Sequence, residues 1–159
     1  MSAKSVVDGA AAGDLELVSF RLGEQLFGIP VSGVQEVVPE QALARIPRSD
    51  RSLAGLLNLR GQIVTAIDLR SRLDVSPNAH PGSSMNIVVS DRGELFSLVV
   101  DSVGDVLSVG ANRIEPPPGT LQSKIRSVCE GICRLEDGLV LVVNIASVLE
   151  LGGNESRRN

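Results

Sequence analysis

The chain has 159 residues, a formal net charge of −4 and a pI of about 5.0. Hydrophobic residues make up 43% and charged residues 21%, a balance that can fill a buried core and that excludes a wholly disordered chain. The acidic charge and the 2% aromatic content exclude the basic surface and the stacking side chains typical of nucleic-acid binding, so we expect no nucleic-acid partner.

The first 14 residues form a polar, aperiodic leader that lacks the apolar segment of a secretory signal. Later apolar runs, such as Leu139 to Val143, fall far short of the roughly 20 residues that cross a bilayer. The two cysteines, Cys129 and Cys133, are too few for a disulfide framework. We therefore expect a cytoplasmic protein with no direct membrane insertion.

The first half of the chain predicts strands separated by turns. An apolar strand over Leu17–Leu22 is followed by a Gly23-Glu24 turn and by a second strand that runs past a small-residue kink into V-x-E-V. After a long irregular connection, a glycine-centred turn leads into a strand over Ile63–Ile67. Asp68 then has the side chain and the position to cap a short helical turn.

A break rich in Ser, Pro, Gly and Asn, residues 76–84, separates this half from a second half with the same order of elements. The second half predicts a strand over Asn86–Ser90, a Gly93-Glu94 turn, a strand over Leu139–Val143 and a helical turn capped by Asn144. Residues 152–159, GGNESRRN, predict a frayed tail.

The two halves also match in sequence. The segment Leu26–Val38 falls on Leu95–Leu107 at a shift of 69 positions, and Ile63–Leu73 falls on Leu139–Leu149 at a shift of 76. Either match alone could be a chance alignment of aliphatic strands, but two in the same order indicate a duplicated unit of about 70 residues. Short strands with frequent turns predict a small closed barrel in each half, and units this small are expected to pack together.

The residues that usually carry catalysis are sparse. The single histidine, His80, lies in the break between the halves, where a solvated loop residue is a simpler interpretation than a general base. Cys129 and Cys133 lack the further ligands of a zinc site, so two small apolar side chains are the simpler interpretation. No nucleotide-binding or nucleophile-elbow motif occurs. We therefore expect no catalytic residue, no metal and no cofactor.

An arginine at a turn is the most informative polar residue. Three leucines crowd just before Arg60-Gly61, and a buried strand explains the leucines but not the arginine. A solvated turn residue is one interpretation of Arg60. The other is an anchor for a partner protein, because a guanidinium offers a planar fork of donors and is common at interface hot spots. Glu36, in the V-x-E-V segment, could hold Arg60 by a charge-assisted pair.

Four segments in order resemble the CheW-type chemotaxis coupling proteins. They are LVSFRLGEQLFGIPVSGVQEVV, LAGLLNLRGQIVTAIDLRSRL, SLVVDSVGDVLSV and LVLVVNIASVLEL, and NLRG followed by DLR is the most specific element. The resemblance runs from about Leu15 to Leu151. It implies one CheW-like domain over residues 15–151, with flexible tails at residues 1–14 and 152–159.

The resemblance implies an all-β fold with short helices, in which two five-stranded SH3-like β-barrels are intertwined. The first barrel is expected at roughly residues 15–75 and the second at roughly residues 85–151, with crossing segments. The family's role implies a non-enzymatic adaptor that joins the cytoplasmic tip of methyl-accepting chemotaxis receptors to the regulatory domain of the histidine kinase CheA. Such an adaptor would be cytoplasmic and recruited to membrane receptor arrays.

The resemblance also implies two contact surfaces. A helical hairpin at the receptor tip would lay an apolar stripe between the barrels, with an arginine fixing its register. The receptor-binding positions implied are Arg60, Glu36, Val34, Asn58, Gly55 and Val103. For the kinase we nominate Val18 and Val31 at the edge of the first barrel, although ordinary core positions explain these two valines equally well.

Departures from the family pattern leave alternatives open. Thr65 stands where the family usually has proline, and Ser52 stands where an aromatic residue is common. The alternative function is a CheW-like regulatory adaptor of a related non-flagellar system, such as pilus motility. A hypothesis from another class, a small β-barrel enzyme or ligand carrier, requires a deep pocket with converging polar groups. The absence of Tyr and Trp and the place of the only histidine argue against it.

Overall fold

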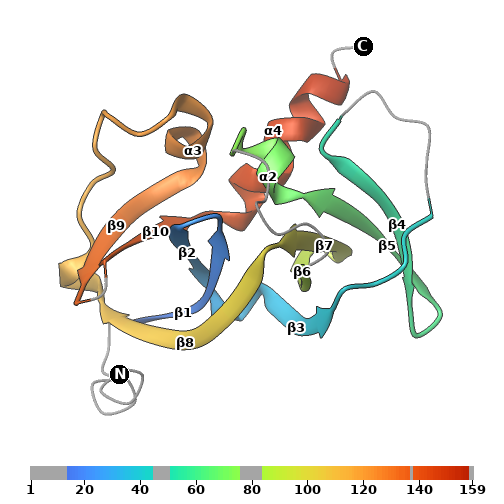
Figure 1. Cartoon of the computed structure of the whole chain (residues 1–159), viewed down its shortest axis with the longest axis horizontal. Helices are drawn as coiled ribbons and strands as arrows, with labels where there is room; N and C mark the ends of the chain where they lie inside the picture. The colour runs from blue at the N-terminus through green and yellow to red at the C-terminus, as the bar shows by residue number, and fades with distance from the viewer. Residues whose placement is uncertain (1–13, 45–50, 76–83, 137, 158–159) are drawn as a thin grey trace.

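Two five-stranded β-sheets make up most of the computed structural model, which describes residues 14–44, 51–75, 84–136 and 138–157 (Figure 1). In the view of Figure 1 the first sheet lies to the left and the second to the right. The first sheet has the strand order β8 (Ser102–Gly110), β1 (Asp14–Leu22), β2 (Gln25–Pro30), β10 (Gly138–Val143) and β9 (Cys129–Leu135). The second has the order β3 (Val34–Pro39), β6 (Met85–Asp91), β7 (Glu94–Val100), β5 (Gln62–Asp68) and β4 (Leu53–Leu59).

Short helices connect and cover the sheets. The 3-10 helices are η1 (Val31–Gly33) and η2 (Ala111–Arg113), and the α-helices are α2 (Leu69–Arg72), α3 (Ser123–Val128) and α4 (Ile145–Arg157). The predicted class, mainly β with few helices and two five-stranded units, is confirmed.

The chain crosses between the sheets, so neither sheet coincides with one half of the sequence. After β1 and β2 the chain leaves the first sheet through η1, and β3 to β7 then build the second sheet. The chain returns to the first sheet at Asp101, between β7 and β8. Each sheet therefore combines a hairpin from one half with three strands from the other, which is the intertwining that the family resemblance implies.

The strand pairing repeats in detail and confirms the duplication. The hairpin β1–β2 closes with Leu22 opposite Gln25, and β6–β7 closes with Asp91 opposite Glu94, 69 positions later. Strand β2 pairs in parallel with β10, where Phe27 lies opposite Leu141. The counterpart pair is β7 with β5, where Phe96 lies opposite Thr65. The two sheets thus have the same order and register, with a hairpin exchanged between them.

One predicted turn needs a correction. Gly23-Glu24 forms the β1–β2 turn as predicted, but the β6–β7 turn is Arg92-Gly93, and Glu94 already belongs to β7. Both turn residues have positive φ, 54° for Arg92 and 81° for Gly93, as tight hairpins with two-residue loops require. The glycine therefore occupies the second position of this turn rather than the first.

Both predicted helix caps are present. The Asp68 carboxylate accepts hydrogen bonds from the Arg70 and Ser71 N–H groups at the start of α2. The Asn144 side-chain oxygen accepts one from the Ser147 N–H, at 2.8 Å, in the first turn of α4. However, α4 continues to Arg157, so it is longer than the predicted helical turn and includes residues predicted as a frayed tail.

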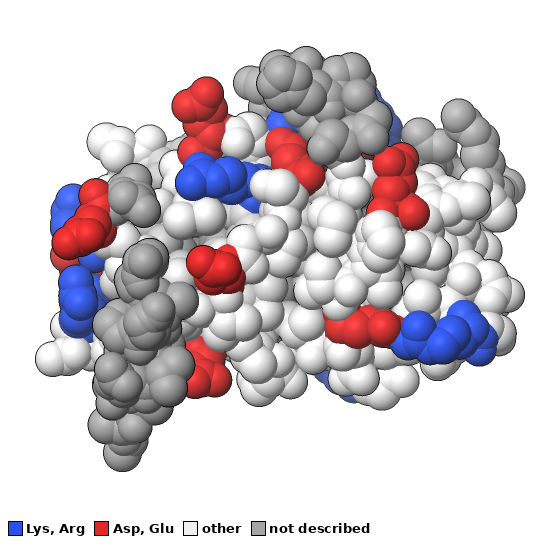
Figure 2. Space-filling view, turned by 60° about the horizontal axis from the view of Figure 1, so that its bottom comes forward, with Lys and Arg blue, Asp and Glu red and all other residues white. Residues whose placement is uncertain are grey.

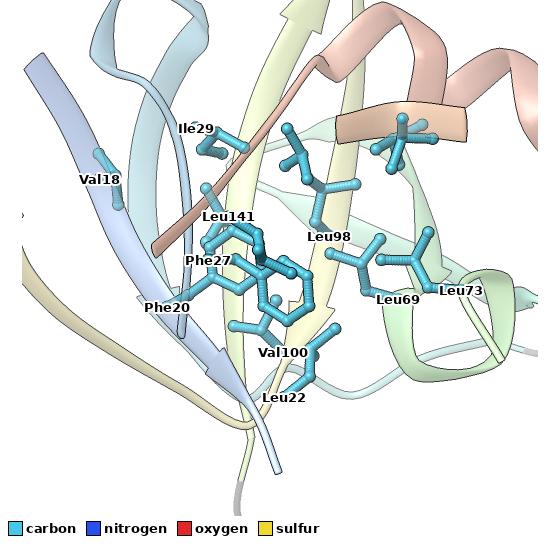
Figure 3. Packing of buried hydrophobic residues seen from close by; sticks show 14 of the residues in the cluster. Val18, Phe20, Leu22, Phe27, Ile29, Leu69, Leu73, Leu98, Val100 and Leu141 are labelled. Carbon is cyan, nitrogen blue, oxygen red and sulfur yellow. The ribbon is translucent and has the colours of Figure 1, made fainter. Parts of the chain in front are cut away.

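A single apolar cluster joins the two sheets. Phe20 and Phe27 of the first sheet stack with ring centroids 5.4 Å apart, and Leu98 and Val100 of the second sheet belong to the same cluster (Figure 3). Two smaller clusters fill the separate sheets, around Leu17, Cys133 and Val140 in the first and around Leu57, Val64 and Ala66 in the second. The prediction that the halves pack together is confirmed.

A half-buried ion pair lies near this shared cluster. Arg70 of α2 donates from Nε to Asp101 Oδ1 at 2.8 Å and from Nη2 to Asp101 Oδ2. The backbone N–H of Gly23 donates to Asp101 Oδ2 at 2.6 Å. Burial raises the pKa of the Asp101 carboxyl, but these hydrogen bonds and the charge of Arg70 outweigh burial and hold the pKa below its ordinary 3.8.

Replacing Asp101 with asparagine is expected to lower the free energy of unfolding at neutral pH and to matter less in acid. Because the folded pKa lies below the unfolded value of 3.8, the carboxylate stabilises the fold above that pH. The contribution is lost as the pH falls from there through the folded pKa. Urea unfolding of both proteins between about pH 7 and pH 3 measures the difference.

The control for this titration is Glu115→Gln, because Glu115 pairs with Arg134 at 3.2 Å on an exposed surface. Exposed pairs contribute little, so this variant should follow the wild type at every pH. A destabilisation by Asp101→Asn that stays constant into acid would contradict the assigned direction of the pKa shift.

Candidate functional site

The β4–β5 hairpin holds the arginine that the sequence singles out. Leu59 and Gln62 close the hairpin, and Arg60 and Gly61 form its two-residue turn with φ of 51° and 86°. The side-chain oxygen of Asn58 accepts a hydrogen bond from the Gly61 N–H at 2.8 Å. A non-glycine residue in this left-handed conformation costs roughly 1–2 kcal/mol, so the local sequence holds Arg60 in place against its own backbone preference.

Arg60 contacts Glu36 across the second sheet. The guanidinium Nη2 donates to Glu36 Oε2, and the predicted pair is therefore present. The Arg60 side chain is 69% exposed and that of Glu36 is 30% exposed. An exposed pair of this kind contributes only about 0–1 kcal/mol to stability, so its main effect is to orient the guanidinium. The remaining donors of Arg60 face solvent and can bind a carboxylate or carbonyl of a partner.

Strand β3, which carries Glu36, also carries two apolar residues that are half-buried or exposed. Val34 at its start is half-buried and packs against the shared cluster, and Val37 is 37% exposed. Ile63 is 61% exposed and lies opposite Asn58 in the β4–β5 pair. The sequence analysis did not single out Ile63. The alternation of side chains along β5 could have indicated its exposure, because Val64 and Ala66 are buried and Ile63 therefore lies on the outer face.

Gly55 occupies its position for a packing reason. It is buried beside a β-bulge in β4, with φ of 147°. A Cβ atom there would lie 2.6 Å from the Ala44 carbonyl oxygen and 3.2 Å from the Leu43 Cβ. Ala44 and Leu56 exchange backbone hydrogen bonds of 2.8 Å at this point. The glycine therefore allows residues 43–44 to close the edge of the second sheet.

Val103 lies on the other sheet from the remaining receptor candidates. It is the second residue of β8, lies opposite Phe20 of β1 and packs half-buried against the shared cluster. The shift of 69 positions makes Val103 the counterpart of Val34. The structure thus brings Arg60, Glu36 and Asn58 together on the second sheet and presents Val103 from the first.

The two kinase candidates differ in burial. Val18 is 7% exposed and belongs to the shared cluster, where it is visible beside Ile29 (Figure 3). Such burial leaves little area for a partner, so Val18 is better explained as a core residue. Val31 begins η1 and is only half-buried against the same cluster. It stays a predicted contact.

The charged side chains of the described residues are dispersed over the surface. Figure 2 shows a face on which most side chains are uncharged, with scattered acidic and basic groups, several of them side by side. Among the described residues, no three His, Cys, Asp or Glu side chains gather to hold a metal ion, and no helix could cross a membrane. Burial raises the pKa of both cysteine thiols, and His80 lies outside the described residues.

Comparison with known proteins gives a consistent set of matches. The model of a family described as the CheW-like domain matches residues 16–152. The chemotaxis protein CheW of Klebsiella aerogenes is 31% identical over 84% of this chain and 81% of its own length. The probable chemotaxis protein CheW of Rhizobium etli is 29% identical over 86% of this chain and 88% of its own.

A solved structure is similar over the same region. It is the crystal structure of the scaffolding protein TtCheW from Thermoanaerobacter tengcongensis, with a TM-score of 0.73 and 32% sequence identity. The similarity covers 82% of this chain and 88% of that protein.

Proposed function

Because the chain belongs to the CheW-like domain family, we propose that it is a non-enzymatic adaptor that joins methyl-accepting chemotaxis receptors to the histidine kinase CheA. The observation that carries this proposal is the family match over residues 16–152, which takes in both sheets and their crossings. The similarity to a scaffolding protein supports the same role. Relatives named as chemotaxis proteins favour chemotaxis over a pilus-motility system.

The receptor-binding surface of this adaptor is centred on the Arg60–Glu36 pair. Arg60 offers unpaired donors at an exposed hairpin tip, and Glu36 fixes the direction of the guanidinium. Ile63 and Val37 add exposed apolar area on the same sheet, and Val103 adds a contact from β8. A helical receptor tip with an apolar stripe and an acceptor for Arg60 fits this combination.

The kinase-binding surface lies elsewhere on the adaptor. The family resemblance implies that the regulatory domain of CheA is the kinase partner, and we propose the half-buried Val31 at the start of η1 as one contact. The adaptor works from the cytoplasm and joins receptor arrays at the membrane through these contacts. Receptor state then biases kinase state through the shared complex, without chemistry in the adaptor itself.

Replacing Arg60 with alanine is expected to weaken binding to a receptor cytoplasmic fragment by about tenfold or more, because it removes the central donor group. Glu36→Arg should weaken binding at least as much, since it repels Arg60 and reverses a charge on the surface. Co-sedimentation with receptor-bearing membranes and titration calorimetry measure the loss, and circular dichroism checks that both variants fold.

Arg134→Ala provides the matched control for this experiment. Arg134 is also an exposed arginine paired with a glutamate, Glu115, but it lies on the first sheet. The control should bind the receptor fragment as the wild type does. If Arg60→Ala and Arg134→Ala bind equally well, Arg60 does not belong to the receptor-binding surface.

A further inference from the structure

The Arg70–Asp101 ion pair lies where the chain returns from the second sheet to the first. Asp101 is the single residue between β7 and β8. Its N–H donates to the Arg21 carbonyl at 3.1 Å, and its carboxylate accepts from the Gly23 N–H at 2.6 Å. These two contacts reach β1 and the β1–β2 turn of the first sheet, whereas Arg70 follows β5 of the second. One residue, through its backbone N–H and its carboxylate, therefore ties three segments from both sheets together.

The ion pair also connects the parts of the proposed receptor-binding surface. Strand β5 begins beside the Arg60-Gly61 turn and runs directly into α2, which carries Arg70. Strand β8 begins right after Asp101 and carries Val103 as its second residue. The pair thus joins the segment that presents Arg60 to the strand that presents Val103.

The burial and geometry of the ion pair indicate a role in orientation in addition to its contribution to stability. The side chains of Arg70 and Asp101 are 12% and 16% exposed, so both are largely removed from water. Within the part of the chain that the structure describes, the buried Arg70 Nη1 has no hydrogen-bond partner, which opposes burial of the guanidinium. Removing two charges from water offsets part of their attraction, but losing only one partner would leave the other charge buried and unpaired. The two parallel N–H···O contacts of the pair are strongly directional.

The duplication supports a specific role for the Arg70–Asp101 pair, because the equivalent positions of the repeat carry no such pair. Ala146 of α4 occupies the position of Arg70, and Ser32 of η1 occupies the position of Asp101. The same change of sheet is thus made at η1 without an arginine and an aspartate. An ion pair is therefore not a general requirement of the crossing.

We propose that Arg70 and Asp101 are positioning residues that fix the orientation of the first sheet relative to the second, and thereby the spacing of Arg60 and Val103. The role in spacing Arg60 and Val103 rests on the proposed receptor-binding function. The role in orienting the two sheets does not depend on that function.

The test measures the distance between the sheets with paired spin labels. Glu16→Cys on β1 and Gln62→Cys on β5 place one label on an exposed position of each sheet. The native Cys129 and Cys133 are buried and should remain unlabelled. Pulsed electron resonance on the otherwise wild-type protein should give one narrow distance distribution. Asp101→Asn should make it about twofold broader, because the sheets then move relative to each other.

Two further variants make the result decisive. Glu115→Gln also neutralises a carboxylate paired with arginine, but on an exposed surface, and should leave the distribution unchanged. Arg70→Lys keeps the charge but loses the planar fork, so its distribution should have intermediate width. A folded Asp101→Asn with the wild-type distribution overturns the proposal. If Asp101→Asn does not fold, Arg70→Lys decides, and a wild-type distribution for it overturns the proposal.

Receptor binding separates the two parts of the proposal. With Arg60 and Glu36 intact, Asp101→Asn should bind the receptor fragment about tenfold more weakly than Glu115→Gln. Equal binding by the two variants would refute the role in spacing Arg60 and Val103. If the wild type does not bind the fragment, the proposed function fails, and the distance measurement still decides whether the ion pair orients the sheets.

Discussion

Replacing Phe27 with alanine is expected to lower the free energy of unfolding by about 3–5 kcal/mol, among the largest losses for any single side chain in this protein. Phe27 is 0% exposed, stacks on Phe20 and lies opposite both Phe20 of β1 and Leu141 of β10. Its removal opens a cavity in the cluster that joins the two sheets. Urea unfolding followed by far-UV circular dichroism measures the change.

The duplication supplies a matched control for this change. Phe96 occupies the position of Phe27 in the second half and lies in the equivalent strand, but it is only half-buried. Phe96→Ala should therefore lose less, about 1–2 kcal/mol, because less apolar area returns to water. Equal losses for the two phenylalanines would show that the shared cluster is not centred on the first sheet's aromatic pair.

Replacing Gly55 with alanine is expected to cost about 2–5 kcal/mol of folding stability, the second large effect. The new Cβ would lie 2.6 Å from the Ala44 carbonyl oxygen, and the φ of 147° disfavours any side chain. Backbone has to move to relieve this contact, and the closure of the second sheet by residues 43–44 would be disturbed. Thermal and urea unfolding measure the loss.

Gly61→Ala separates backbone strain from crowding. Gly61 also has positive φ, 86°, but among the described residues other than its chain neighbours no atom lies within 4 Å of a Cβ built there. The Gly61→Ala variant should lose only about 1 kcal/mol of folding stability.

Receptor binding by Gly55→Ala should fall only as far as the fraction of folded protein falls. A stable Gly55→Ala variant that fails to bind would instead make Gly55 a contact residue.

Local features of the fold could be predicted from the sequence because they depend on neighbouring residues. The strand over Leu17–Leu22, the turn at Arg60-Gly61 and the caps at Asp68 and Asn144 each follow from side chains within a few positions. The crossing between sheets does not, and only the family resemblance implied it. The duplicated halves offer strands of the same kind, so the pattern does not tell whether β2 pairs with its own half or the other.

In the candidate site, too, some features could be predicted from the local sequence and others depend on distant segments. The contact of Glu36 with Arg60 could be anticipated from charge and position. The burial of Val18 and the close approach of Ala44 to Gly55 depend on distant segments, which local patterns do not reveal. Helix α4 continues through Gly152 and Gly153 into residues that the sequence analysis predicted as a frayed tail, although glycine disfavours helices.

The exchanged hairpin sets the order in which this protein can fold during synthesis. Strand β2 pairs with β10, so Leu26 finds its neighbour Val140 only after the whole second sheet has left the ribosome. Strand β1 gains its second neighbour, β8, earlier, whereas β2 has only β1 beside it until β10 emerges. The edge of β2 in the first hairpin therefore stays open for pairing with other strands during most of this interval.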